Sequence, residues 1–230
     1  MELIGHRGGA ALGPENTLAA IEAGIAAGAD GVEIDVRLTL DGALVLMHDP
    51  DVMRTTGGAG RVGDLTLDAI RALNVPTLEQ ALEAVPADRL LIVELKGHPW
   101  EAGYDPAEPT AHAVAAMLAA VGDRRLLVSS FNPLALHVVR EEAPEVPTAV
   151  LTTSAFDLAS NLAGAIDGGH AECHVPAQIL EESFIGEAHA AGRRVVAWTV
   201  DDPERLRTFA GWGVDGVITD DPGAARRALG

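Results

Sequence analysis

Cysteine, aromatic residues and positive charge are all scarce in this sequence. Cys173 is the only cysteine, so no disulfide can form within the chain, and its apolar, strand-like surroundings favour a buried thiol over a nucleophile. Sixteen lysines and arginines face thirty-four acidic residues, a formal net charge of −18. This charge argues against a nucleic-acid or anionic-membrane surface. An aromatic content of 3% also leaves few rings for stacking single-stranded nucleic acid.

Long hydrophobic runs are missing as well. No stretch approaches the roughly 18 apolar residues of a membrane-spanning helix. The first residues, MELIGHRGG, contain neither a basic leader nor an apolar signal core. We therefore expect a cytoplasmic protein with no membrane span, and nothing in the sequence indicates an oligomeric state. Because the chain is acidic, a phosphate-bearing substrate would need local cations or a bound metal.

Strand-like and helix-like segments alternate along the whole chain. A helix-like segment follows each strand, for example Phe156–Ala165 after the fifth. Alternation of this kind indicates a parallel sheet, and eight units in 230 residues favour a closed (β/α)8 TIM barrel over an open doubly wound sheet. Without a linker or low-complexity tract, we expect one domain over residues 1–230. The expected strands are Glu2–His6, Gly31–Val36, Leu90–Leu95, Leu126–Ser129, Thr148–Leu151, Ala171–His174, Val195–Trp198 and Val214–Ile218.

The second strand carries an unusual set of residues and a hairpin extension. Glu33 and Asp35 alternate with β-branched residues, so both carboxylates share one face of the strand. Asp41-Gly42 then favours a two-residue turn that leads into a second arm, Ala43–His48. In that register the numbers of paired residues sum to 83, which predicts that Asp35 and His48 are cross-strand neighbours. The hairpin would bring an imidazole over two acids.

The expected strand ends place three acids at one mouth of the barrel, where TIM-barrel active sites form. Glu94 ends the third strand, beside Glu33 and Asp35 of the second. Three close carboxylates repel one another unless a cation lies between them, and hard oxygen ligands suit Mg²⁺ or Ca²⁺. The alternative is a structural network in which the acids pair with nearby cations. The candidate partners in that network are Arg7, Arg37 and Lys96.

Two histidines and two cations complete the expected site. His6 ends the first strand and His48 returns on the hairpin, so both would flank the acids. Two histidines can act as general base and general acid near neutral pH. Arg7 and Lys96 would supply positive charge to a phosphoryl oxygen. His174 ends the sixth strand without comparable neighbours, and no role is assigned to it.

These residues lie in ordered motifs that resemble the glycerophosphodiester phosphodiesterases, in their compact single-domain bacterial form, over nearly the whole chain. The resemblance therefore implies that this chain forms a phosphodiesterase-like TIM barrel. The matching segments are GHRG (5–8), PENT (14–17), VEIDVRLTLDGALVLMHD (32–49), PTLEQAL (76–82), VELKG (93–97), SSF (129–131), AWTVD (197–201) and GVDGVITDDP (213–222).

The resemblance implies roles for individual residues. His6 and His48 would be the catalytic acid–base pair, and Arg7 and Lys96 would hold the phosphate. Glu15 would lie near the metal and glycerol. The divalent metal, Mg²⁺ or Ca²⁺, would be bound by Glu33, Asp35 and Glu94, and the glycerol or leaving-group pocket would be lined by Phe131 and Trp198.

The implied reaction is the metal-dependent hydrolysis of a glycerophosphodiester to glycerol 3-phosphate and an alcohol. The nucleophile is either water or the neighbouring glycerol hydroxyl, which would give a transient cyclic phosphate. Two alternatives remain open. One is a phosphodiesterase that acts on lysophospholipids or other diester head groups, and the other is a phosphate-binding barrel without catalysis.

Overall fold

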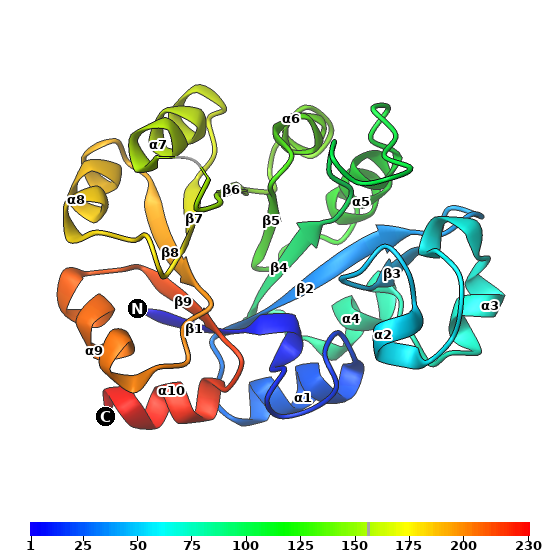
Figure 1. Ribbon diagram of the computed structural model, residues 1–230, viewed down its shortest axis with the longest axis horizontal. Helices are drawn as coiled ribbons and strands as arrows, with labels where there is room; N and C mark the ends of the chain where they lie inside the picture. Colours follow the sequence, from blue (N-terminus) through cyan, green and yellow to red (C-terminus); the bar gives the residue numbers. More distant parts are fainter. Residues whose placement is uncertain (156) are drawn as a thin grey trace.

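The computed structural model describes residues 1–155 and 157–230. Eight parallel strands close into a barrel, because β1 pairs with both β2 and β9, and helices surround the strands (Figure 1). The TIM barrel predicted from the sequence is confirmed. The strands are β1 Glu2–Gly5, β2 Gly31–Leu38, β3 Leu44–Leu46, β4 Leu90–Leu95, β5 Leu126–Ser130, β6 Thr148–Leu151, β7 Glu172–Pro176, β8 Arg194–Trp198 and β9 Gly216–Thr219.

Helices follow the barrel strands and pack around the outside of the sheet (Figure 1). The predicted helix after β6 is confirmed over 158–165, and Phe156 lies outside the described residues. Two short 3-10 helices occupy His6–Gly8 and Val62–Asp64. The α-helices are α1 Leu18–Ala26, α2 Met53–Thr56, α3 Leu67–Arg71, α4 Leu78–Ala84, α5 Pro109–Ala119, α6 Pro133–Glu142, α7 Leu158–Asp167, α8 Glu182–Ala190, α9 Pro203–Trp212 and α10 Pro222–Leu229. In the described part of the chain, none of the helices could cross a membrane.

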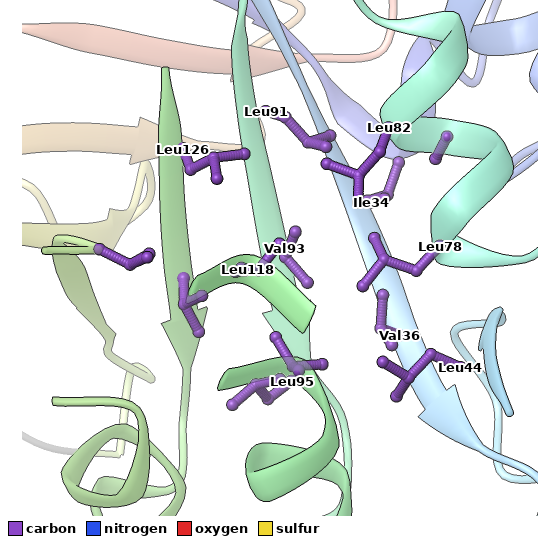
Figure 2. Close-up of a cluster of buried hydrophobic side chains, with 14 of the residues drawn as sticks. Ile34, Val36, Leu44, Leu78, Leu82, Leu91, Val93, Leu95, Leu118 and Leu126 are labelled. Atoms are coloured by element: carbon purple, nitrogen blue, oxygen red, sulfur yellow. The ribbon is translucent and has the colours of Figure 1, made fainter. Parts of the chain in front are cut away.

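Alternation along β2 and β4 separates the packing face from the site. Ile34 and Val93 point outward into the core cluster that α4 and α5 cover, as Figure 2 shows. Ile92 points into the barrel, where it joins an apolar inner layer with residues of several other strands. Glu94 lies two residues beyond Ile92 on the same face, toward the carboxyl end of β4. The inner layer therefore forms an apolar floor below the acids.

The hairpin forms, but its register differs from the prediction. Thr39 N donates to Ala43 O over 2.9 Å, so the loop contains three residues, of which Gly42 has a φ of +81°. A left-handed glycine is typical of three-residue hairpin loops. Paired residue numbers consequently sum to 82, as in Val36 and Leu46. The prediction that Asp35 lies opposite His48 is wrong.

His48 nevertheless reaches the barrel mouth, because the chain leaves the ladder before it. The last hydrogen bond runs from Met47 N to Asp35 O over 3.0 Å. Beyond it, the Arg37 guanidinium donates to the His48 carbonyl from Nε at 3.0 Å and from Nη2 at 2.8 Å. This side chain, rather than strand pairing, fixes the backbone that carries the imidazole.

Close packing positions the other end of the site, the GHRG segment. Gly8 has a φ of +92°, and a Cβ there would lie 2.7 Å from Ile21 N in α1. A Cβ on Gly24 would lie 1.9 Å from the Gly8 carbonyl oxygen. Two glycines therefore allow the segment to pack directly on α1. Arg7 is held at a φ of +51°, which is uncommon for a residue with a side chain.

Candidate active site

A cavity of about 190 Å³ lies at the carboxyl ends of the barrel strands. Asp35 lies beside it with 1% of its surface exposed, and Glu15 lines a neighbouring cavity that also contacts His48. His174, for which the sequence suggested no role, also lines the first cavity. The predicted site residues in the cavity wall are His6, Arg7, Glu33, His48, Glu94, Lys96, Phe131 and Trp198.

The three predicted acids form one buried cluster. Asp35 of β2 is the register partner of Glu94 of β4, and Glu33 lies two residues earlier on the same face. One carboxylate oxygen from each acid lies within 4.8 Å of the other two. The exposed fractions of the three residues are 3%, 1% and 8% for Glu33, Asp35 and Glu94. These residues are therefore close enough to share a cation.

Asp35 is the anchored member of the cluster. Asn16 donates from Nδ2 to Asp35 Oδ2 over 2.7 Å and accepts from Asp35 N over 3.0 Å. Lys96 Nζ lies 2.8 Å from the other carboxylate oxygen. Burial alone would raise the pKa of Asp35, but the positive charge of Lys96, with His48 and Arg7, holds it well below its ordinary value. Asp35 is thus ionised and fixed in orientation.

Glu33 has the opposite electrostatic environment. Burial, followed by the charge of Asp35, raises the pKa of Glu33 to about 8. Arg7 N donates to Glu33 Oε2 over 3.0 Å. Within the described chain no group donates to the buried Glu33 Oε1. An oxygen without a partner, in a carboxyl that resists ionisation, is the group that a divalent cation would stabilise.

The predicted structural network accounts for only part of the cluster. Lys96 contacts both Asp35 and Glu94, and Arg7 Nε lies 3.4 Å from Asp35. Arg37, by contrast, points away from the acids and pairs with Glu101 over 3.0 Å. Two of the three proposed cations therefore take part, and neither donates a side-chain hydrogen bond to Glu33 Oε1.

In each of the two predicted catalytic histidines, Nδ1 is hydrogen-bonded to a carboxylate. His6 Nδ1 lies 2.6 Å from Asp220 Oδ1, and His48 Nδ1 lies 2.7 Å from Asp49 Oδ1. A carboxylate oxygen only accepts, so Nδ1 carries a proton and Nε2 remains for substrate. Burial lowers the pKa of His6, but the hydrogen bond to Asp220 and the charge of Glu33 outweigh it and raise the pKa.

Arg54 connects the histidine and arginine sides of the site. Its Nε donates to Asp49 Oδ2 over 2.5 Å, and its Nη1 and Nη2 donate to the two Glu15 carboxylate oxygens over 2.8 and 2.6 Å. Glu15 in turn accepts from Arg7 Nη1 over 2.7 Å. In this structure Glu15 therefore orients Arg7. A direct contact of Glu15 with metal or glycerol stays a prediction.

Two aromatic rings form one wall of the cavity. Phe131 and Trp198 meet edge to face with ring centroids 5.7 Å apart. Trp198 Nε1 donates to the His174 carbonyl over 3.1 Å, and this bond holds the indole of β8 against β7. An apolar wall opposite charged groups suits a small carbon skeleton attached to a phosphate.

Sequence reasoning missed four polar residues that hold the site together, Asn16, Asp49, Arg54 and Asp220. All but Arg54 fall within motif segments quoted above, yet none was given a function. Asp49 directly follows His48, and this adjacency was an available signal. Asp220 is 214 positions from His6, so only closure of the barrel reveals their contact.

The closed barrel and the ionisable groups at its C-terminal mouth define the chain as a TIM-barrel enzyme. Residues 6–224 match the glycerophosphoryl diester phosphodiesterase family. The chain belongs to this family, whose members are phosphoric diester hydrolases.

Individual relatives align with this chain over nearly their full lengths. The glycerophosphodiester phosphodiesterase of Caldanaerobacter subterraneus is 31% identical over 240 residues, which cover 96% of this chain and 94% of the relative. The crystal structure of the Thermotoga maritima enzyme is 29% identical with a TM-score of 0.82, covering 99% of this chain and 97% of that one. An Oleispira antarctica phosphodiesterase in complex with the product sn-glycerol-3-phosphate is 27% identical with a TM-score of 0.89, covering 100% and 96%.

Proposed function

We propose that this protein hydrolyses glycerophosphodiesters to glycerol 3-phosphate and an alcohol, with His6 and His48 as the acid–base pair and a divalent metal, Mg²⁺ or Ca²⁺, in the acid cluster. The observation that carries the proposal is the pair of carboxylate-oriented histidines that line one cavity beside a cluster of three buried acids. The product named for the Oleispira antarctica relative supports the substrate class.

The residues that would hold the metal are Glu33, Asp35 and Glu94. Their donor set consists of carboxylate oxygens, which suits a hard cation, and Glu33 Oε1, which has no partner among the described residues, supports the fit. A bound divalent cation would offset charge on the phosphoryl oxygens. Arg7 and Lys96 would add positive charge from the protein itself, and the charge of Lys96 is secured because Glu94 and Asp35 outweigh burial and raise its pKa.

Proton transfer is assigned to the two imidazoles. One Nε2 would take the proton of the attacking hydroxyl or water, and the other would give a proton to the departing alcohol oxygen. Asp220 and Asp49 would hold the rings and stabilise whichever imidazole becomes charged. Phe131 and Trp198 would hold the glycerol or the leaving group against the apolar wall.

Identification of the products tests this assignment directly. Phosphorus NMR of glycerophosphocholine incubated with the protein and Mg²⁺ or Ca²⁺ should show conversion to glycerol 3-phosphate, with free choline formed in equal amount. Release of phosphocholine and glycerol would contradict the proposed bond cleavage. A panel of lysophospholipids and other diesters would rank the alternatives, and a rapid-quench search for a cyclic phosphate would identify the nucleophile.

A further inference from the structure

His174 is a buried histidine at the active-site cavity that the acid–base scheme does not use. Its neighbours in β7, Cys173 and Val175, pack outward into the core under the surrounding helices. Because side chains alternate along a strand, His174 faces into the barrel. It lines the same cavity as His6 and His48, although 0% of its surface is exposed to solvent.

One nitrogen of His174 is committed to a carboxylate. Nε2 lies 3.0 Å from Glu172 Oε2, and Glu172 Oε1 lies 3.1 Å from Arg194 Nε. A carboxylate oxygen can only accept, so the proton of the neutral imidazole lies on Nε2. Nδ1 of His174 therefore presents a lone pair and acts as an acceptor.

In the described part of the chain, this acceptor is one of the buried polar atoms without a hydrogen-bond partner. Among residues 1–155 and 157–230, no group donates to His174 Nδ1, and the atom is buried from solvent. A buried acceptor without a hydrogen bond is unfavourable. A donor from a bound molecule would satisfy it, and the cavity that His174 lines is the place from which such a donor can come.

The chemistry of the cavity selects the donor. A phosphoryl oxygen is an acceptor and cannot satisfy Nδ1, whereas a hydroxyl can. Leu151, the register partner of His174, and Trp198, whose Nε1 donates to the His174 carbonyl, line the cavity next to His174 and suit carbon atoms, while the acids and Lys96 suit the phosphate end of a ligand. The ligand portion near His174 is thus a short carbon skeleton that bears a hydroxyl group.

We propose that Nδ1 of His174 accepts a hydrogen bond from a hydroxyl of the substrate's glycerol moiety, which makes His174 a specificity-determining contact. Glu172 and Arg194 maintain the required tautomer. The inference rests on the proposed function for the identity of the ligand. It adds a residue that discriminates glycerol from an alkyl group of the same length.

The test compares two ligands that carry the same phosphate charge and the same number of carbon atoms. Calorimetric titration of the Ca²⁺-loaded protein with sn-glycerol 3-phosphate and with propyl phosphate measures the preference for hydroxyl groups. We expect the wild-type protein to prefer glycerol 3-phosphate by about tenfold or more. His174→Leu should remove most of this preference by weakening glycerol 3-phosphate binding alone. Ile218→Val, which removes a methylene from the same cavity and no polar atom, should keep it.

A conservative variant and a spectrum of the wild type complete the test. His174→Gln retains a donor for Glu172 and an adjacent acceptor, so it should recover part of the preference. The nitrogen-15 resonance of His174 Nδ1 in the wild-type protein should shift on adding glycerol 3-phosphate and stay in place with propyl phosphate. The spectrum needs no variant, so it applies even where His174→Leu fails to fold.

Three results would overturn the proposal: a wild-type protein without the preference, a His174→Leu protein that keeps it, or an Nδ1 resonance that responds to both ligands alike. Binding is measured without turnover, so its outcome is separate from that of the proposed reaction. Hydrolysis of glycerophosphocholine with an unchanged preference in His174→Leu would remove the His174 contact and leave the reaction in place.

Discussion

His6 and Asp220 are separated by 214 positions in the chain, and His6 Nδ1 lies 2.6 Å from Asp220 Oδ1. The contact exists because β1 and β9 are neighbours in the closed barrel. His6 therefore depends for its orientation and charge on a residue near the other end of the chain. The two ends of the sequence meet in one hydrogen bond at the candidate active site.

Replacing Asp220 with asparagine tests that dependence. The substitution removes a negative charge that raises the pKa of His6, so the limb of the pH–kcat profile due to His6 should move to lower pH. The loss in kcat should remain smaller than the about 10²- to 10⁴-fold that general acid–base catalysis contributes. Asp68→Asn, on an exposed helical site, is the control. An unshifted limb in Asp220→Asn would contradict the assignment.

The same variant predicts a pH-dependent change in stability. The folded pKa of His6 lies above its unfolded value of 6.5, so its contact contributes stability that is fully present below pH 6.5. That stability is lost as pH rises through the folded pKa. Thermal unfolding should show a larger Tm difference between wild type and Asp220→Asn at pH 5.5 than at pH 9. A difference that grows toward pH 9 would refute the linkage.

Removing either of the two imidazoles proposed as acid and base should abolish most of the activity. His6→Ala and His48→Ala should each lower kcat by about 10²- to 10⁴-fold, the contribution of a positioned acid or base. His112→Ala is the matched control, because His112 pairs with Glu142 on the outer helices, with 48% of its side chain exposed. Circular dichroism should show that all three variants remain folded. Near-normal turnover by His48→Ala would remove the hairpin from the mechanism.

In the metal-free state, the Glu33→Gln protein should become more stable relative to the wild type as pH rises. The Glu33 carboxyl has a pKa of about 8 when folded against 4.5 as a model value, so the folded state keeps a proton that the unfolded state releases. Stability of the wild type therefore falls between pH 4.5 and 8. With chelator present, the Tm of Glu33→Gln minus that of wild type should increase over this range. A Tm difference that stays constant over this range would show that the pKa of Glu33 is not raised in the folded protein.

Arg54→Ala should weaken catalysis through the residues that it holds. Its guanidinium donates to Asp49 and Glu15, which contact His48 and Arg7. We expect kcat to fall by about tenfold, equivalent to about 1.4 kcal/mol, with partial recovery in Arg54→Lys. Arg71→Ala, an exposed arginine outside the site, should have no effect on kcat. If Arg54→Ala changed only the Tm, the role of Arg54 would be structural.

Local periodicity was enough to place the acids. Alternation in β2 puts Glu33 and Asp35 on one face, and parallel neighbours bring Glu94 beside them. Both inferences need only the side-chain period of a strand and the order of strands in a barrel. The proximity of these three residues was therefore predictable from the sequence.

The position of His48 was predictable only in outline. The turn contains three residues instead of two because Gly42 adopts a left-handed conformation and the Asp41 carboxylate accepts from Thr39 and Leu67. One added residue shifts the register by one and separates Asp35 from His48. Arg37 then holds His48 at the barrel mouth by donating to the His48 carbonyl. Such side-chain hydrogen bonds have no periodic signature in a sequence.

The central claim is most directly tested by metal removal and return. Hydrolysis of glycerophosphocholine should cease after thorough treatment with chelator and resume on addition of Mg²⁺ or Ca²⁺, because the buried Glu33, Asp35 and Glu94 carboxylates would hold the cation. Turnover that persists at full rate in the metal-free protein would contradict the account.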